Sequence, residues 1–209
     1  MKKTSKVLTL LLCAVLLIAG TVAGTVAYLS DSSETVTNTF SVGNIDIEMK
    51  EHALGADGQL TDTETVEEDS YKILPGTQQP KDPFVRIFAD SEACYVFVQV
   101  WEVNNAASDS LRYVSWEIDD QWTLLKTENN VSTYYLTLNH AMSDEDEEYN
   151  VLKDKTVSYS ENLTKDMIDA LGENVPQLVF KGFAVQLGAA STADDAWAQV
   201  ASESLPPQS

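Results

Sequence analysis

Apolar and polar side chains alternate along most of the chain after an apolar N-terminal run, which is the pattern expected of β-strands. The clearest example is Cys94–Val103, where both alternating sets are largely apolar, so we predict a central strand buried on both faces. Asp and Asn residues stand between neighbouring segments and favour turns. We therefore expect antiparallel hairpins in a β-sandwich or a barrel. The other predicted strands are Phe84–Ala89, Arg112–Ile118, Gln121–Lys126, Val131–Leu138, Thr156–Ser160 and Leu178–Leu187.

The segment Asn38–Met49 contains a change of phase. Phe40 and Val42 belong to one alternating set, whereas the apolar residues from Ile45 onward belong to the other. A shift of one residue sends the following side chains to the opposite face of a sheet. Gly43-Asn44 therefore marks either a bulge within one strand or the break between two short strands.

Two short helices are predicted from capping signals. Thr164–Leu171 begins with a candidate N-cap and is followed by Gly172, a common stop. Thr192-Ala193-Asp194-Asp195 resembles a capping box, and apolar residues then recur at helical spacing as far as Val200. This second helix is expected to place Trp197 on the sandwich.

Two acidic segments that are poor in large apolar residues, Glu51–Ser70 and Ser143–Asn150, are predicted to be surface loops. No internal repeat or second boundary divides the rest of the chain. We therefore expect one sandwich domain over residues 28–205, with an N-terminal strand at 28–49 and a disordered tail at 206–209.

The first residues have the pattern of an export signal. Three lysines precede the apolar stretch Val7–Ala19, whose length is typical of a signal peptide. Thr25-Val26-Ala27 offers the small residues that a signal peptidase requires. We therefore predict that residues 1–27 are a cleaved signal peptide, in preference to a retained membrane anchor or a buried helix. The predicted cut lies between Ala27 and Tyr28.

The protein is strongly acidic. The whole chain has 13 Lys and Arg against 33 Asp and Glu, and loss of three N-terminal lysines brings the net charge from −20 to −23. Such a charge repels nucleic acid and anionic membranes, so we expect no nucleic-acid partner and membrane contact only through the uncleaved signal. Salt or divalent cations relieve the self-repulsion. After cleavage Cys94 is the only cysteine, which excludes an intramolecular disulfide.

The common hydrolase patterns are missing from the sequence. The chain has two histidines, His52 and His140, and no HExxH motif, which disfavours a zinc site. No Gly-x-Ser-x-Gly elbow is present. Cys94 begins an apolar strand, where we expect an inert buried thiol rather than a nucleophile paired with His140. We therefore predict that the protein is not an enzyme and has no firm metal site.

One acidic run, Ser143–Glu148, suggests a ligand. Carboxylate oxygens are the ligands that Ca²⁺ prefers, but the run lacks the spacing of a defined calcium loop. We predict a solvated charge run, with Asp144, Asp146 and Glu148 as candidate ligands of weakly bound Ca²⁺. The strand aromatics are predicted to lie in the core rather than to form a carbohydrate platform; they are Trp101, Trp116, Trp122, Tyr134 and Tyr135.

The N-terminal region carries a recognisable pattern. Residues 24–31 read GTVAYLSD and residues 37–47 read TNTFSVGNIDI. Together they resemble the export and first-strand signature of the TasA/camelysin family. Looser resemblances to the wider group follow at Leu74-Pro75-Gly76, Lys81-Asp82-Pro83, Cys94–Val98, Phe183–Gln186 and Ala196-Trp197.

The resemblance implies a jelly-roll-like fold, processing by a dedicated signal peptidase and export to the matrix or surface of a Gram-positive type of bacterium. It also implies assembly into biofilm-matrix fibres, in which the N-terminal segment of one subunit completes the sheet of the next. By position, the donor segment lies within Tyr28–Met49. Its expected anchors are Phe40, Val42, Ile45 and Ile47.

Two classes of function follow from these observations. The first is a secreted structural protein that self-associates, or joins related matrix subunits, by β-strand addition. The second is a secreted monomer, either an adhesin or ligand-binding module or a divergent metallopeptidase of the camelysin kind. In an isolated monomer, the first strand is expected to fold back into its own sheet.

Overall fold

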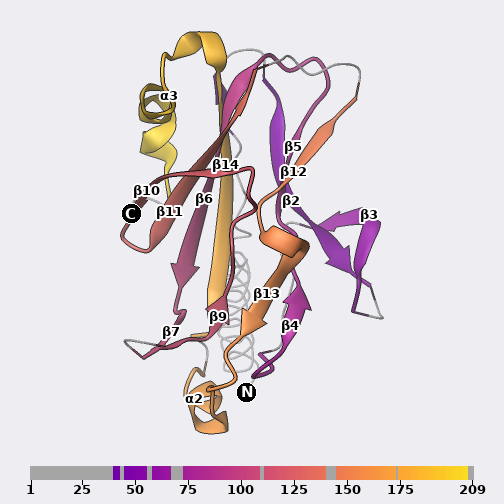
Figure 1. Ribbon diagram of the computed structural model, residues 1–209, viewed down its shortest axis with the longest axis vertical. Helices are drawn as coiled ribbons and strands as arrows, with labels where there is room; N and C mark the ends of the chain where they lie inside the picture. Colours follow the sequence, from indigo (N-terminus) through magenta and orange to yellow (C-terminus); the bar gives the residue numbers. More distant parts are fainter. Residues whose placement is uncertain are drawn as a thin grey trace, which may run out of the picture. The chain divides into compact units, whose positions relative to one another are not determined.

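The computed structural model describes residues 40–42, 45–55, 58–66, 73–108, 111–139, 145–172 and 174–206, all within the compact unit Thr37–Ser209 (Figure 1). The predicted signal peptide, its cleavage site Ala27–Tyr28, the Gly43-Asn44 break, His140 and Asp144 lie outside the described residues. No helix in the described part is long and apolar enough to cross a membrane.

A five-stranded sheet contains the longest strands. Its spatial order is β1 (Phe40–Val42), β14 (Gln177–Gln186), β6 (Cys94–Val103), β11 (Val131–Leu138) and β10 (Thr123–Glu128). The pair of β1 and β14 is parallel, and the other neighbours are antiparallel. The sheet therefore places the predicted central strand β6 in the middle of its order.

A four-stranded antiparallel sheet has the order β12 (Glu147–Asn150), β5 (Phe84–Ile87), β2 (Ile47–Leu54) and β3 (Leu60–Val66). The chain passes between the two larger sheets after β5 and again after β11, as connections in jelly-roll-like sandwiches do. Two smaller sheets contain β4 (Gln78–Pro80), β13 (Thr156–Tyr159) and β9 (Val114–Ser115), and β7 (Ala106–Ser108) and β8 (Leu111–Arg112).

The two larger sheets pack face to face. One buried cluster combines Val96, Val98 and Val100 of β6 with residues of β2, β5 and β14. A Cβ atom placed on Gly182 of β14 would lie 3.6 Å from Met49 Sδ on the opposite sheet. The predicted all-β antiparallel sandwich is therefore confirmed.

The other face of β6 is covered by the C-terminal region. Helix α3 (Ala193–Val200) places Trp197 against Phe97 and Phe183, with ring centroids 5.4 and 5.2 Å apart. Asp195 N donates a hydrogen bond to Thr192 Oγ1, which confirms the predicted N-cap. Beyond the helix, Leu205 N donates to the buried Gln99 side chain at 2.7 Å. The prediction that β6 is buried on both faces is correct.

Local turn and cap chemistry matches the sequence predictions elsewhere. Asn129 and Asn130 have φ of 50° and 63° and join β10 to β11, as a type I′ hairpin turn requires. Helix α2 (Lys165–Asp169) begins after Thr164, whose hydroxyl accepts a hydrogen bond from Met167 N. The described residues also form three short 3₁₀ helices, η1 (Lys153–Lys155), η2 (Leu187–Ala189) and η3 (Ala201–Glu203).

The prediction that Glu51–Ser70 and Ser143–Asn150 are surface loops is wrong. Residues 51–54 continue β2, β3 lies within the first acidic segment, and β12 occupies the end of the second. Both β3 and β12 are edge strands, which can pair through their backbones without an apolar alternation. The threonine-rich sequence of β3 also has high β-propensity.

Removal of the buried Phe97 side chain should destabilise the folded protein far more than removal of the exposed Leu124 side chain. Phe97 is fully buried, whereas Leu124 on β10 is 54% exposed. We expect Phe97→Ala to lower the free energy of unfolding by about 3–5 kcal/mol and Leu124→Ala to change it by less than about 0.5 kcal/mol. Urea titration of both variants measures the difference, and similar losses would contradict the assigned packing.

Candidate assembly site at the edge of the five-stranded sheet

The first described strand lies at an edge of the five-stranded sheet. Phe40 pairs with Phe183, Ser41 with Ala184 and Val42 with Val185, and the two strands run parallel. A parallel pair is slightly less stable per residue than an antiparallel one. Among the described strands, β1 thus combines an edge position with a parallel pairing.

The four predicted donor anchors separate into two groups. Phe40 and Val42 lie in β1, on the five-stranded sheet. Ile45 and Ile47 are each 4% exposed and belong to the core cluster, and β2 lies in the other sheet between β5 and β3. The phase change in the sequence therefore coincides with a change of sheet, because each side of Gly43-Asn44 belongs to a different layer.

The opposite edge of the same sheet, β10, is protected against strand addition. Its register with β11 shifts between Leu124 and Lys126, which indicates a bulge. Lys126 and Glu128 are joined by an ion pair of 2.9 Å on this strand. Bulges and charged side chains are devices that discourage edge-to-edge pairing. The two edges of the sheet therefore differ in chemistry.

A network of ionisable side chains around β2 was not foreseen from the sequence. His52 Nδ1 lies 2.7 Å from Asp82 Oδ2, and His52 N donates to Asp82 Oδ1 at 3.1 Å. Lys81 Nζ donates to Glu51 Oε1 at 2.6 Å. All four residues are at least 92% buried. Two weak signals stood in the sequence: the polar pair Glu51-His52 at the end of an apolar strand, and the resemblance noted at Lys81-Asp82-Pro83.

Arg86 continues the network on the outer face of the four-stranded sheet. Its guanidinium donates to Glu148 on β12 at 2.7 Å and to Glu48 on β2 at 2.5 Å. The hydrogen bond to Glu148 raises the pKa of Arg86 above its ordinary value, and nearby carboxylates add to the effect. His52 Nε2 lies 3.9 Å from the same Glu148. The three strands β2, β5 and β12 are thus joined by charge as well as by backbone pairing.

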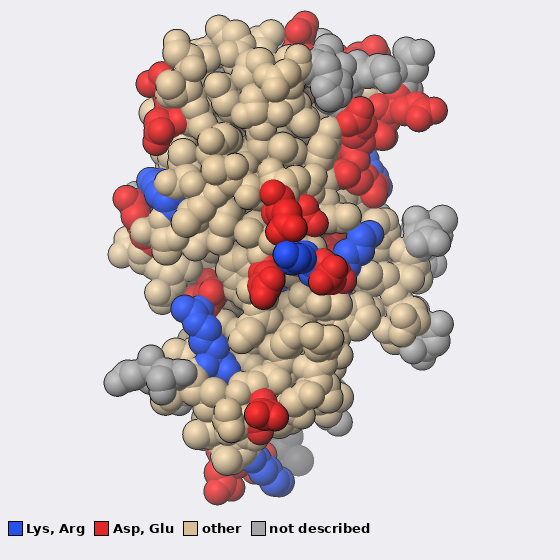
Figure 2. Space-filling model, viewed as in Figure 1, with Lys and Arg blue, Asp and Glu red and all other residues tan. Residues whose placement is uncertain are grey.

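The candidate calcium ligands have protein partners where they are described. Asp146 Oδ1 accepts a hydrogen bond from Ala89 N at 2.9 Å, and Glu148 is paired with Arg86. Acidic side chains gather beside β12 in the upper right of Figure 2. Within the ranges that the structure describes, no group of three or more His, Cys, Asp or Glu residues is arranged to hold a metal ion.

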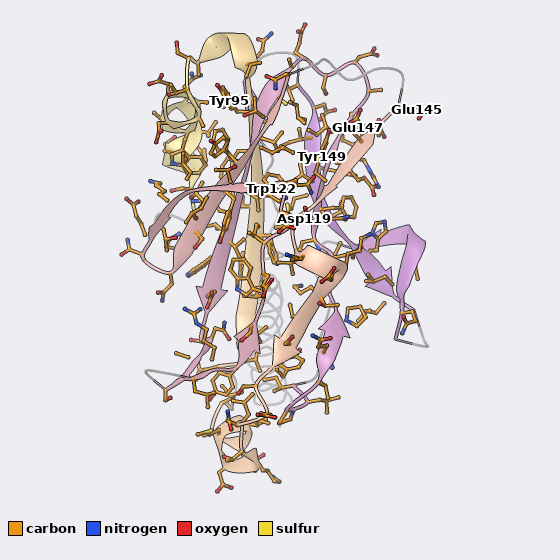
Figure 3. All side chains as sticks on the ribbon, viewed as in Figure 1. Tyr95, Asp119, Trp122, Glu145, Glu147 and Tyr149 are labelled. Atoms are coloured by element: carbon orange, nitrogen blue, oxygen red, sulfur yellow. The ribbon has the colours of Figure 1, made fainter. Side chains whose placement is uncertain are left out.

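Aromatic side chains serve the packing. Trp122 is 5% exposed, and its Nε1 donates to Asn150 O at 2.7 Å (Figure 3). Trp116 and Tyr134 meet edge to face on the side of the main core, and Tyr135 packs against the cluster under α3. These contacts support the core assignment of Trp116, Trp122, Tyr134 and Tyr135 over a carbohydrate platform, whereas Trp101 is half-buried.

Cys94 is fully buried at the start of β6. Burial raises the pKa of its thiol to about 12. A neutral, enclosed thiol is a poor nucleophile. The expected inert thiol therefore agrees with the structure.

Alkylation should distinguish this buried thiol from an accessible one. In a chain that begins at Tyr28, Cys94 is the only cysteine. We expect iodoacetamide at pH 8 to label it on the order of a hundredfold more slowly in the folded protein than in urea, because the thiolate is scarce and enclosed. Mass spectrometry over time measures both rates, and equal rates would show that Cys94 is exposed.

No protein-family model matches this chain, and no curated protein or solved structure matches it either.

Proposed function

We propose that this protein is an exported structural subunit that forms extracellular fibres by giving its N-terminal strand to the sheet of a neighbouring copy. The observation that carries the proposal is the position of β1, which among the described strands pairs only with β14, at an edge of the five-stranded sheet. A strand in that position can be replaced by the same strand of another copy while all other strand pairs stay intact. Head-to-tail exchange whose rotation does not close into a ring produces filaments.

The sequence before β1 suggests that the donor is longer than β1. Within the described residues, β1 and β14 pair in parallel at Phe40–Phe183, Ser41–Ala184 and Val42–Val185. Residues 34–42 read ETVTNTFSV, a sequence rich in Thr and Val, which favour strands. We therefore propose residues 34–42 as the donor segment and β14 of the neighbouring copy as its acceptor.

The charge of the protein sets the conditions for assembly. A predicted net charge of −23 after cleavage makes copies repel one another in dilute buffer. At about 0.15 M salt the screening length falls to roughly 8 Å, and exposed charges on neighbouring copies then interact weakly. Assembly should accordingly increase with salt or with divalent cations.

Truncation tests the proposal directly. One chain begins at Tyr28 and the other at Ile45, so that the second lacks β1 but keeps the core residues of β2. We expect fibres only from the longer chain, as judged by electron microscopy and sedimentation over a range of salt and Ca²⁺ concentrations. Circular dichroism and urea titration establish that the shorter chain is folded. Monomers from both chains under all conditions would favour a secreted monomeric module instead.

A matched pair of proline substitutions tests the donor segment. Ser41 lies in the middle of β1, and proline there removes a backbone N–H and restricts φ within the strand. Ser32 precedes the proposed donor. We expect Ser41→Pro to reduce the mass of sedimented fibre by about tenfold or more, and Ser32→Pro to leave it unchanged. Equal effects of the two substitutions would exclude residues 34–42 as the donor.

A further inference from the structure

We propose that the segment Lys81–Pro83, which joins β4 to β5, is a lock that fixes β2 in the sandwich from both faces. If the proposed function is right, this lock also limits the exchangeable part of the chain to the residues before Ile45. The lock itself is a property of the monomer.

The inner half of the lock is an ion pair in the space between the sheets. Glu51 follows the inward-facing Ile47 and Met49 along β2, and its Oε1 accepts a hydrogen bond from Lys81 Nζ at 2.6 Å. Lys81 Nζ also lies 5.5 Å from the centre of the Phe180 ring on β14. Both residues are more than nine-tenths buried. Movement of β2 would separate two charges that water cannot easily reach.

The outer half of the lock is the pair Asp82 and His52, which follow Lys81 and Glu51 in the sequence. Asp82 is 1% exposed and contacts His52 twice, through the backbone N–H and through Nδ1. The His52 ring stacks on Phe84, with centroids 4.7 Å apart. Lys155 Nζ lies 3.5 Å from the same Asp82 carboxylate. Asp82 thus holds a backbone position of β2, not only a side chain.

The two halves act on successive residues of one strand. Glu51 and His52 point to opposite faces of β2, and Lys81 and Asp82 meet them in the same order. A slip of β2 by one residue would send each side chain to the wrong face and leave all four buried groups without these partners. The segment itself is held by Lys81 N, which donates to Lys155 O, and by Pro83 O, which accepts from Val151 N.

β1 and β2 therefore differ in how they are held. β2 has strand neighbours on both sides, core residues on its inner face and the lock at Glu51 and His52. β1 is an edge strand paired with β14. Local opening of a protein begins where few such contacts must break. The lock accounts for a donor that ends before Ile45, although the family resemblance implied Ile45 and Ile47 as further anchors.

Hydrogen exchange of the monomer at low salt tests the lock without reference to fibres. In the chain that begins at Tyr28, we expect amides of β2 to exchange as slowly as those of β6, and amides of β1 to exchange much faster. Asp82→Ala should accelerate exchange in β2 by about tenfold to a hundredfold relative to β6. The matched control is Asp120→Ala, since the side chain of Asp120 is 85% exposed; it should change neither strand.

A second variant covers the case in which Asp82→Ala does not fold. His52→Ala removes the ring that contacts Asp82 and Phe84 and should produce the same selective acceleration in β2. Unchanged exchange in β2, or an acceleration shared equally by β6, would overturn the lock. A failure of the protein to form fibres would overturn the proposed function and leave this measurement unaffected.

Discussion

Burial of β6 on both faces is the constraint on which the rest of the structure depends. Its inner valines meet the four-stranded sheet, and its outer Phe97 requires a second cover, which α3 provides through Trp197. The C-terminal segment then continues over the same face to Gln99. A sheet with one solvated face would need neither the helix nor this return of the chain. The order of layers, from α3 to the four-stranded sheet, thus follows from one doubly apolar strand.

Apolar strands and capped helices could be predicted from the sequence, and polar edge strands could not. Cys94–Val103 and Val131–Leu138 match β6 and β11 at both ends, because alternation there reflects burial. β12 was predicted as a loop because its sequence is acidic and lacks an apolar alternation. An edge strand beside charged partners can nevertheless pair with little apolar surface. The phase change after Val42 was visible, but the choice between a bulge and two strands depended on which sheet each part joins.

The ionic network around β2 shows a second kind of feature that could not be predicted from the sequence. His52 and Asp82 are 30 residues apart in sequence, and neither belongs to a motif that predicts their contact. Long-range polar pairs follow from topology, which brings the segment before β5 against β2. The sequence resemblance at Lys81-Asp82-Pro83 singled out these residues but did not indicate what they do. Their contacts with Glu51 and His52 indicate a structural role.

The parallel direction of β1 has a consequence for any filament built by its exchange. A donor strand enters β14 in one orientation only, so every subunit in the row points the same way. Such a filament is polar: one terminal subunit offers an empty acceptor edge, and the other presents a donor strand with no recipient. Growth, capping and attachment to a cell surface would then be different chemical problems at the two ends.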